Sequence, residues 1–383
     1  MNKNTPKALV LCMLISLLTG CFPSGELKTS SEPVTNSANN ATSSENSDNS
    51  ESSAPAAPAV PQDLEHVKFN IELDSEYPTE LPVVKAKLAT FDFEEVKPIF
   101  LGDKNVTAEG NGIYYTDDGI TFIVRDDQID YWASHRYGND EEKQLIYTIQ
   151  TAAVNNLSQN YMNYPSINSE LEGFPRSEAL ERANELVEKV GLKYFGEPTV
   201  YTFISEEVEV NLAGKITAYK DGGDILEIHL PKENEFYYIK YPTTFNDITA
   251  PETNDTIYGG THQALSFVKI ILTKDELVDF SCIGVYEEIE VVDTIPIKCS
   301  AESALSKLYD YYLHRENEGN MKERYEYNSL DLAYITFDEN YDTGEITYKP
   351  LWCAEGTVYD LDGTRLANSG DKYIDPATGF VFG

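Results

Sequence analysis

The sequence lacks the residue patterns that mark several large functional classes. Its five cysteines and five histidines include no Cys-x-x-Cys and no two histidines at metal-ligand spacing, which argues against a zinc site. Positive charge is scarce, since 29 Lys+Arg stand against 65 Asp+Glu and give a formal net charge of −36. A field of this sign repels nucleic acid and anionic lipid head groups. We therefore expect no nucleic-acid partner, and no folded part lying flat on a membrane.

Catalytic motifs are also missing. There is no Gly-x-Ser-x-Gly nucleophile elbow, no Ser-x-x-Lys in a penicillin-binding context and no phosphate-binding glycine loop. The adjacent acids Glu206-Glu207 and Glu287-Glu288 are predicted in strands, where each pair points to opposite faces and not across a cleft. A nucleophile built from Cys282 or Cys353 with a histidine is neither supported nor excluded. The sequence predicts no enzyme, no metal and no cofactor.

Two acidic segments have the composition of calcium-binding loops but lack the required spacing of ligands. In 338–344 the glycine comes one place late for an EF-hand, and position 12 is Lys349 instead of glutamate. In 360–363 the position of the first ligand holds Val358. Both segments are better interpreted as turns that use Asp and Gly geometry.

The N-terminal residues have the order of an export signal. Lys3 and Lys7 precede an apolar run from Ala8 to Leu18, about half the length of the ~20 residues that a spanning helix needs. The following Leu18-Thr19-Gly20-Cys21 resembles the lipobox of bacterial lipoproteins. The resemblance implies a signal peptide over residues 1–20, cleavage before Cys21 and a diacylglycerol on its thiol. We therefore expect an extracytoplasmic protein that is lipid-anchored to the cell membrane.

Residues 21–63 are rich in Ser, Asn, Thr, Glu, Pro and Ala and have almost no large apolar side chain. Such a segment cannot bury enough surface to offset its ordering entropy, so it is predicted to be a disordered tether. Signal cleavage and lipidation leave Cys282, Cys299 and Cys353, an odd number. The sequence leaves two alternatives for these cysteines: a disulfide between Cys282 and Cys299, or three buried thiols that pack as small apolar groups.

Apolar spacing predicts an α+β fold with two modules of antiparallel sheet, each packed by one or two helices, over 64–250 and 260–383. The content of 26 Tyr and 16 Phe favours a sheet-rich protein. Helices are predicted over 92–100, 141–160, 178–190 and 301–314, the third capped by Ser177 and the fourth by Ser300. Strands are predicted over most of the remainder, including 208–219 and a hairpin over 266–282.

Aromatic residues are the remaining candidates for binding. Exposed rings on a sheet can line a sugar or peptide groove, although most such rings belong to the core. The candidates for such a role are Trp132, Tyr114, Tyr115, Tyr237 and Tyr238. Trp352 is predicted to belong to the core.

The C-terminal residues carry a family resemblance. The pattern consists of a helix capped by Ser300, the strand segment 332–335, Lys349-Pro350-Leu351-Trp352 and a closing segment 373–379. It resembles the C-terminal part of YycH/YycI-type extracytoplasmic regulators, whose modules are related to the PepSY fold. Pro376 departs from the family pattern, which has a small residue there, and a lipobox replaces the usual transmembrane helix. The whole layout resembles uncharacterised clostridial-type lipoproteins of Gram-positive bacteria.

The resemblance implies a cell-surface lipoprotein that acts as a non-catalytic interaction or regulatory module at the envelope. A sensor kinase or a protease of the envelope is the expected partner, beside the membrane reached through the lipid on Cys21. One alternative is a peptide- or glycan-binding lipoprotein, and another is a wall-active enzyme. The predicted strand meanders argue against the two α/β lobes of a solute-binding protein.

Overall fold

A computed structural model describes residues 61–73, 77–133, 141–160, 164–213, 228–245, 248–250, 266–340 and 343–382, which fall within one compact unit. The predicted signal peptide, Cys21 and the tether up to residue 60 lie outside these residues. The same holds for the predicted turn at 221–223 and for most of the loop predicted over 243–260.

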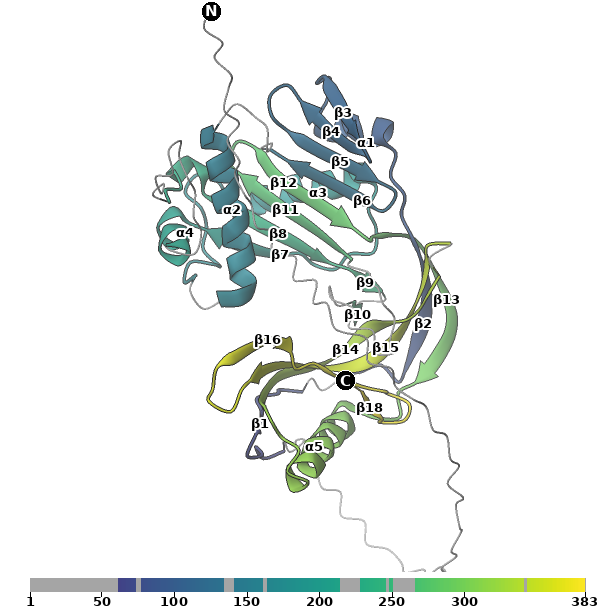
Figure 1. The fold of residues 1–383 in the computed structure, drawn as a ribbon. Coiled ribbons are helices and arrows are strands. Elements are labelled where there is room, and N and C mark those ends of the chain that lie inside the picture. Colours follow the sequence, from purple (N-terminus) through teal and green to yellow (C-terminus); the bar gives the residue numbers. More distant parts are fainter. Residues whose placement is uncertain are drawn as a thin grey trace, which may run out of the picture. The chain divides into compact units, whose positions relative to one another are not determined.

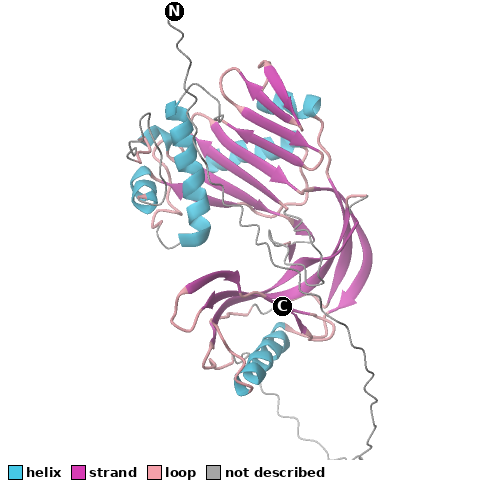
Figure 2. Ribbon diagram, in the orientation of Figure 1, coloured by secondary structure: helices cyan, strands magenta, loops and turns pink. Residues whose placement is uncertain are grey.

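The first sheet has eight strands in the order β3-β4-β5-β6-β12-β11-β8-β7, and all neighbours are antiparallel (Figures 1 and 2). Its strands are β3 (Val106–Gly110), β4 (Ile113–Thr116), β5 (Thr121–Arg125), β6 (Gln128–Trp132), β7 (Thr199–Phe203), β8 (Phe236–Pro242), β11 (Phe267–Thr273) and β12 (Leu277–Ile283).

Helices contribute to a separate core on each face of this sheet. On one face, α1 (Phe93–Phe100) and α3 (Arg176–Val190) pack into a core that contains Phe122 and Phe280. On the other face, α2 (Glu141–Asn160) and α4 (Ser205–Leu212) form one hydrophobic core with residues such as Phe203, Phe236 and Tyr238. The 3₁₀ turn η2 (Lys232–Asn234) leads into β8.

The second sheet is built around one long hairpin, β14 (Arg324–Asn340) and β15 (Glu345–Tyr359). On its other side β15 pairs with β2 (Glu80–Leu88), β17 (Lys372–Ile374) and β16 (Arg365–Ser369). Further strands are β13 (Tyr286–Pro296), which pairs with β2, and β18 (Val381–Phe382), which pairs with β17. At the edge of the second sheet, β1 (Val67–Phe69) pairs with β14. A separate small pair consists of β9 (Thr244–Phe245) and β10 (Ile248–Thr249).

One helix, α5 (Ala301–Asn317), covers part of the second sheet. The Ser300 side chain accepts a hydrogen bond from the Ser303 amide at 3.3 Å, so the predicted cap is present. Trp352 is fully buried in this core, as predicted, and its Nε1 donates to the Cys299 carbonyl at 2.9 Å. The predicted α+β fold of antiparallel sheets packed by helices is confirmed.

Two local predictions were wrong. Residues 208–212 form the end of helix α4 and not a strand, because Val208 and Leu212 are buried together at a spacing of one helical turn. Glu206 and Glu207 therefore lie in the first turn of a helix, where acidic side chains are favourable. Helix α3 starts at Arg176 after Pro175, so Ser177 lies inside the helix and is not its cap.

Sheet membership also differs from the division predicted near 250–260. Strands β1 and β2, from the N-terminal side of that division, pair within the second sheet. Strands β11 and β12, from its C-terminal side, occupy the middle of the first sheet. The chain thus crosses between the sheets twice, which local apolar spacing does not reveal.

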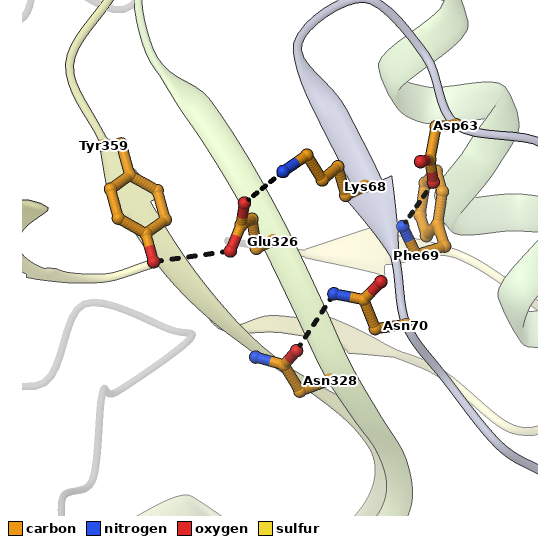
Figure 3. Close-up of polar contacts among 7 residues, drawn as sticks. All are labelled: Asp63, Lys68, Phe69, Asn70, Glu326, Asn328 and Tyr359. Atoms are coloured by element: carbon orange, nitrogen blue, oxygen red, sulfur yellow. Dashed lines mark hydrogen bonds and ion pairs between the residues drawn. The ribbon is translucent and has the colours of Figure 1, made fainter. Parts of the chain in front are cut away.

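The first described strand, β1 (Val67–Phe69), lies parallel to β14 at the edge of the second sheet. Val67 and Phe69 are buried in the core under α5. Figure 3 shows the polar contacts on this strand: Lys68 Nζ lies 2.7 Å from Glu326 Oε1, and Asp63 accepts a hydrogen bond from the Phe69 amide at 3.0 Å. The chain is therefore fixed to the second sheet where the predicted tether ends.

Candidate functional site

The five aromatic candidates divide between the two faces of the first sheet. Tyr114 and Tyr237 belong to the core beneath α1 and α3. Tyr114 stacks on Phe93, with ring centroids 3.8 Å apart, and the buried Tyr237 hydroxyl donates to the Phe174 carbonyl at 2.9 Å. These two rings therefore pack into the core, where Tyr237 is fully buried and Tyr114 is half-buried.

The other three candidates lie on the opposite face. Cross-strand register aligns Tyr115 with Thr121, and Thr121 with Trp132. Trp132 on β6 lies opposite Asp279 on β12. Tyr238 lies in the same register on β8, two strands beyond β12. Trp132 and Tyr115 are half-buried, whereas Tyr238 is only 6% exposed. The structure thus brings three of the five together on one face, and of these Tyr238 is a core residue.

A row of polar side chains runs across four strands of this face. Asp130 on β6 lies opposite Ser281 on β12, Ser281 opposite Lys269 on β11, and Lys269 opposite Lys240 on β8. We call these four residues, together with Asp279, the polar row. The Ser281 hydroxyl donates to Asp130 Oδ1 at 2.6 Å, and the Gln128 amide donates to Asp130 Oδ2.

Helix α2 contributes one further group to the polar row. The Tyr147 hydroxyl donates to Asp279 Oδ2 at 2.8 Å. On β11, Lys269 Nζ lies 4.0 Å from the centroid of the Phe267 ring. Lys269 also interacts electrostatically with Asp279. The acidic groups of the row therefore lie on β6 and β12, and the two lysines lie opposite each other on β11 and β8.

Burial shifts the pKa values of the row in opposite directions for acids and bases. Desolvation raises the pKa of Asp279 to about 7, although the Tyr147 hydrogen bond opposes the shift. Desolvation also raises the pKa of Asp130, against the hydrogen bond from Ser281. The same burial lowers the pKa values of Lys240 and Lys269. Asp279 is therefore able to change charge near neutral pH, which is characteristic of functional sites and also of buried structural networks.

A second feature is a hollow beside the segment that connects α3 to β7. Its volume is about 730 Å³, and Tyr194, Phe195 and Tyr241 contribute aromatic side chains to its lining. Tyr194 has a left-handed backbone with φ of 65°, an unusual conformation for a bulky residue. Its carbonyl accepts a hydrogen bond from the Thr244 amide at 2.9 Å, which fixes the strained residue in place.

The third feature is the free side of β13. Within the described residues, β13 pairs with β2 alone. Residues 290–294 are exposed one after another, and Val291 and Val292 have exposed fractions of 57% and 48%. The β13–β2 register shifts between Val291 and Asp293, so Val292 has no partner on β2. An exposed strand edge presents backbone donors and acceptors to another chain.

The remaining residues considered from the sequence can be placed in the structure. Cys282, Cys299 and Cys353 are buried and form no disulfide, and the first two lie in the cores of different sheets. In the turn 360–364 the Asp360 carboxylate accepts hydrogen bonds from the Asp362 and Thr364 amides at 3.0 Å, so it serves turn geometry. Across the described ranges, no group of His, Cys, Asp and Glu side chains is arranged to hold a metal ion. No helix in the same ranges combines the length and apolarity needed to cross a membrane.

The sequence interpretation missed the polar row and the β13 edge. The signal for the row was a single charged residue inside each of several apolar strands, such as Lys269 within 267–273 and Asp279 within 277–283. The register that brings these residues together joins positions as far apart as Asp130 and Ser281, 151 residues along the chain, which the sequence pattern does not show. For β13 the extended chain was predicted, but its place at a sheet edge was not.

Comparison with known proteins adds information on the fold. No family model and no curated protein matches the sequence. A solved structure of an uncharacterized protein from Eubacterium rectale ATCC 33656 is similar, with a TM-score of 0.56 and 14% sequence identity. The match covers 84% of this chain and 91% of that chain. At this level of identity, the similarity between the chain and the Eubacterium rectale protein shows a shared fold alone.

Proposed function

We propose that the protein is a lipid-anchored interaction module of the bacterial envelope, without catalytic activity of its own. The observation that carries the proposal is the exposed edge of β13, with two adjacent exposed valines beside an unpaired strand side. Edge strands of this kind bind other proteins by adding a strand to the sheet. The lipobox-like segment ending at Cys21 and the resemblance to YycH/YycI-type regulators support a role at the membrane surface.

Site-specific photocrosslinking in intact cells tests this function. A photoreactive amino acid replaces Val292 in the full chain with Cys21 retained, and the matched control carries it at Val210, an exposed valine on α4. We expect a crosslinked envelope protein, such as a membrane kinase or protease, from position 292 and not from position 210. Identical products at both positions, or no protein product at position 292, would contradict the proposal.

Ligand capture is a second candidate function. It is favoured by the aromatic lining of the hollow at Tyr194 and by the strained backbone of that residue. Soluble wall fragments and short peptides serve as probes, with calorimetry on the wild type and on the Tyr194→Ala variant. Heat of binding that disappears in the variant would favour this function, whereas no heat with any probe would exclude it for these ligands.

A further inference from the structure

The chemistry of the β13 edge restricts the partner that it can bind. Residues 286–296 contain four acidic residues and no basic one. Lys87 on β2 lies 2.6 Å from Glu287, and Lys85 lies 2.9 Å from Glu345, so each of these nearby lysines already has an acidic partner. Lys87 therefore pairs with one acid of β13, whereas Glu290 and Asp293 form no ion pair with either lysine.

Glu290 and Asp293 are the two acids next to the exposed valines. Both are exposed, and neither forms an ion pair with any residue that the structure describes. The Asp293 carboxylate accepts only the amide of the next residue, Thr294, at 2.8 Å. These two carboxylates flank Val291 and Val292, so the edge presents an apolar centre between negative charges.

A second copy of the chain does not fit this edge. Two β13 strands paired antiparallel around the valines would place Glu290 and Asp293 of one copy near the acids of the other. Like charges on directly opposed residues destabilise a strand pair, and charged edge residues protect sheets against self-association. The net charge of −36 adds repulsion over a longer range.

The β13 edge is also less protected than the edges at β7 and β1. At the edge strand β7, the Thr202 amide donates to the Ile167 carbonyl at 2.8 Å, so a neighbouring segment already uses part of that edge. At β1, the Glu316 carboxylate accepts the His66 amide at 2.6 Å. On β13, residues 290–294 stay exposed over five consecutive positions.

We propose that β13 binds an extended basic segment of another protein, which adds a strand with an apolar residue near Val291 and Val292 and with Lys or Arg near Glu290 and Asp293. This inference rests on the proposed function and specifies its partner. Backbone hydrogen bonds supply affinity, and the flanking charges supply specificity and faster association.

Synthetic peptides test the charge requirement. The probe is a nine-residue peptide of Val and Thr with blocked termini and with Lys at positions 4 and 7, a spacing that matches Glu290 and Asp293, and matched peptides carry Glu or Gln in place of Lys. Binding to the purified full chain is measured by fluorescence anisotropy at low and high salt. We expect the Lys peptide to bind at least tenfold more tightly than the Glu peptide, with the difference shrinking at high salt.

Charge reversal at the edge is the sharper test. In the double variant Glu290→Lys with Asp293→Lys, the preference should invert in favour of the Glu peptide. The matched control reverses Glu181 and Glu188, two exposed acids on α3, and should keep the wild-type preference. A preference unchanged by reversal at β13, or inverted equally by the control, overturns the inference.

Hydrogen exchange separates failure of this inference from failure of the proposed function. Added protection of amides in 287–294 by the Lys peptide, absent in the Val292→Lys variant, is the expected result. If the Gln peptide protects β13 as well as the Lys peptide does, strand addition stands and the basic partner is wrong. If no peptide protects β13 and no crosslink forms at position 292, both proposals fail.

Discussion

The first sheet carries the polar row of carboxylates and amines on one face, whereas the second sheet contains a network of buried tyrosine hydroxyls. Tyr312 and Tyr327 share a hydrogen bond of 2.6 Å, and Tyr327 donates to the Gly370 carbonyl at 2.7 Å. Tyr286 bonds Tyr348 in the same sheet. Burial raises the pKa of Tyr327 well above its usual value, so this network stays neutral at physiological pH. The polar row, in contrast, contains groups whose charge depends on pH.

The comparison shows two ways of fixing a sheet. Tyrosine hydroxyls that bond one another stay neutral over the ordinary pH range, so their contribution to the stability of the second sheet does not depend on pH. The polar row of the first sheet contains carboxylates and amines whose pKa values are shifted by burial, so its contribution changes when one of these groups gains or loses a proton. Five measurements test this difference, in order of decreasing expected effect.

Trp352→Ala should give the largest loss, about 3–5 kcal/mol of unfolding free energy, because a fully buried ring is removed. Urea denaturation, followed by circular dichroism and by the fluorescence of Trp132, measures it. Trp132→Ala is the matched control in the first sheet and should cost clearly less, since Trp132 is only half-buried. If Trp352→Ala and Trp132→Ala lowered the unfolding free energy equally, the assignment of Trp352 to a core and of Trp132 to a half-buried position would be wrong.

Tyr327→Phe should cost about 1–3 kcal/mol, because the Gly370 carbonyl and the Tyr312 hydroxyl lose a buried partner. The loss should be the same from pH 5 to pH 8, since no group in this contact titrates there. Denaturation curves at several pH values measure it. A cost that varies strongly with pH would show that the hydroxyl network is coupled to charged groups.

Asp279→Asn tests the titrating row. Because the folded-state pKa of about 7 lies above the ordinary carboxyl value, Asp279 favours folding below pH 4 and this contribution disappears as pH rises through 7. Between about pH 4 and pH 7 the unfolding free energy of the wild type should fall by up to about 1.4 kcal/mol per pH unit. The Asp279→Asn variant should not show this pH dependence. Tyr147→Phe should extend the range to higher pH. An unchanged slope in Asp279→Asn would refute the assignment.

Asp375 should show the opposite pH dependence in the second sheet. Burial alone would raise its pKa, but the hydrogen bond from Lys349 Nζ at 2.9 Å, with further bonds from backbone amides, lowers it. Its contribution is therefore present above pH 4 and lost as pH falls through the folded-state pKa. Asp375→Asn should cost less than about 1 kcal/mol at pH 7 and nothing in acid. A loss that persists in acid would assign the effect to turn geometry.

The smallest effect is expected at the surface pair of Figure 3. Lys68 is mostly exposed, and its ion pair with Glu326 is screened by water and salt. Lys68→Ala should leave the melting temperature unchanged within error, as measured by calorimetry. A clear drop would show that the first strand is held by this side chain and not by Val67 and Phe69.

Much of the fold was predictable from local patterns, and the errors have physical causes. Apolar spacing located α1, α2 and α5, and the glycine at 191 correctly ended α3 with a left-handed residue at φ of 78°. The segment 208–212 alternates valine with polar residues, which favours a strand. Its helix is decided by burial of Val208 and Leu212 in the core around α2, a tertiary effect.

The candidate sites were much less predictable. Trp132 and Tyr115 were selected as aromatic residues, and only strand register shows that they share a face with Asp279 and Lys269. Tyr237 was selected for the same reason and is buried, because its neighbour Tyr238 takes the opposite face of β8. Neither the order of strands nor the identity of edge strands follows from local periodicity.

Strand β1 has a mechanical consequence. Any pull that reaches the folded part from its N-terminal side acts first on β1, which is held to β14 over three register positions. Phe69 stacks near Tyr327, with centroids 6.0 Å apart, inside the core that α5 covers. Detaching β1 under tension would therefore open the core beneath α5. In the proposed anchored protein, this short strand is the link that transmits load from the membrane to the second sheet.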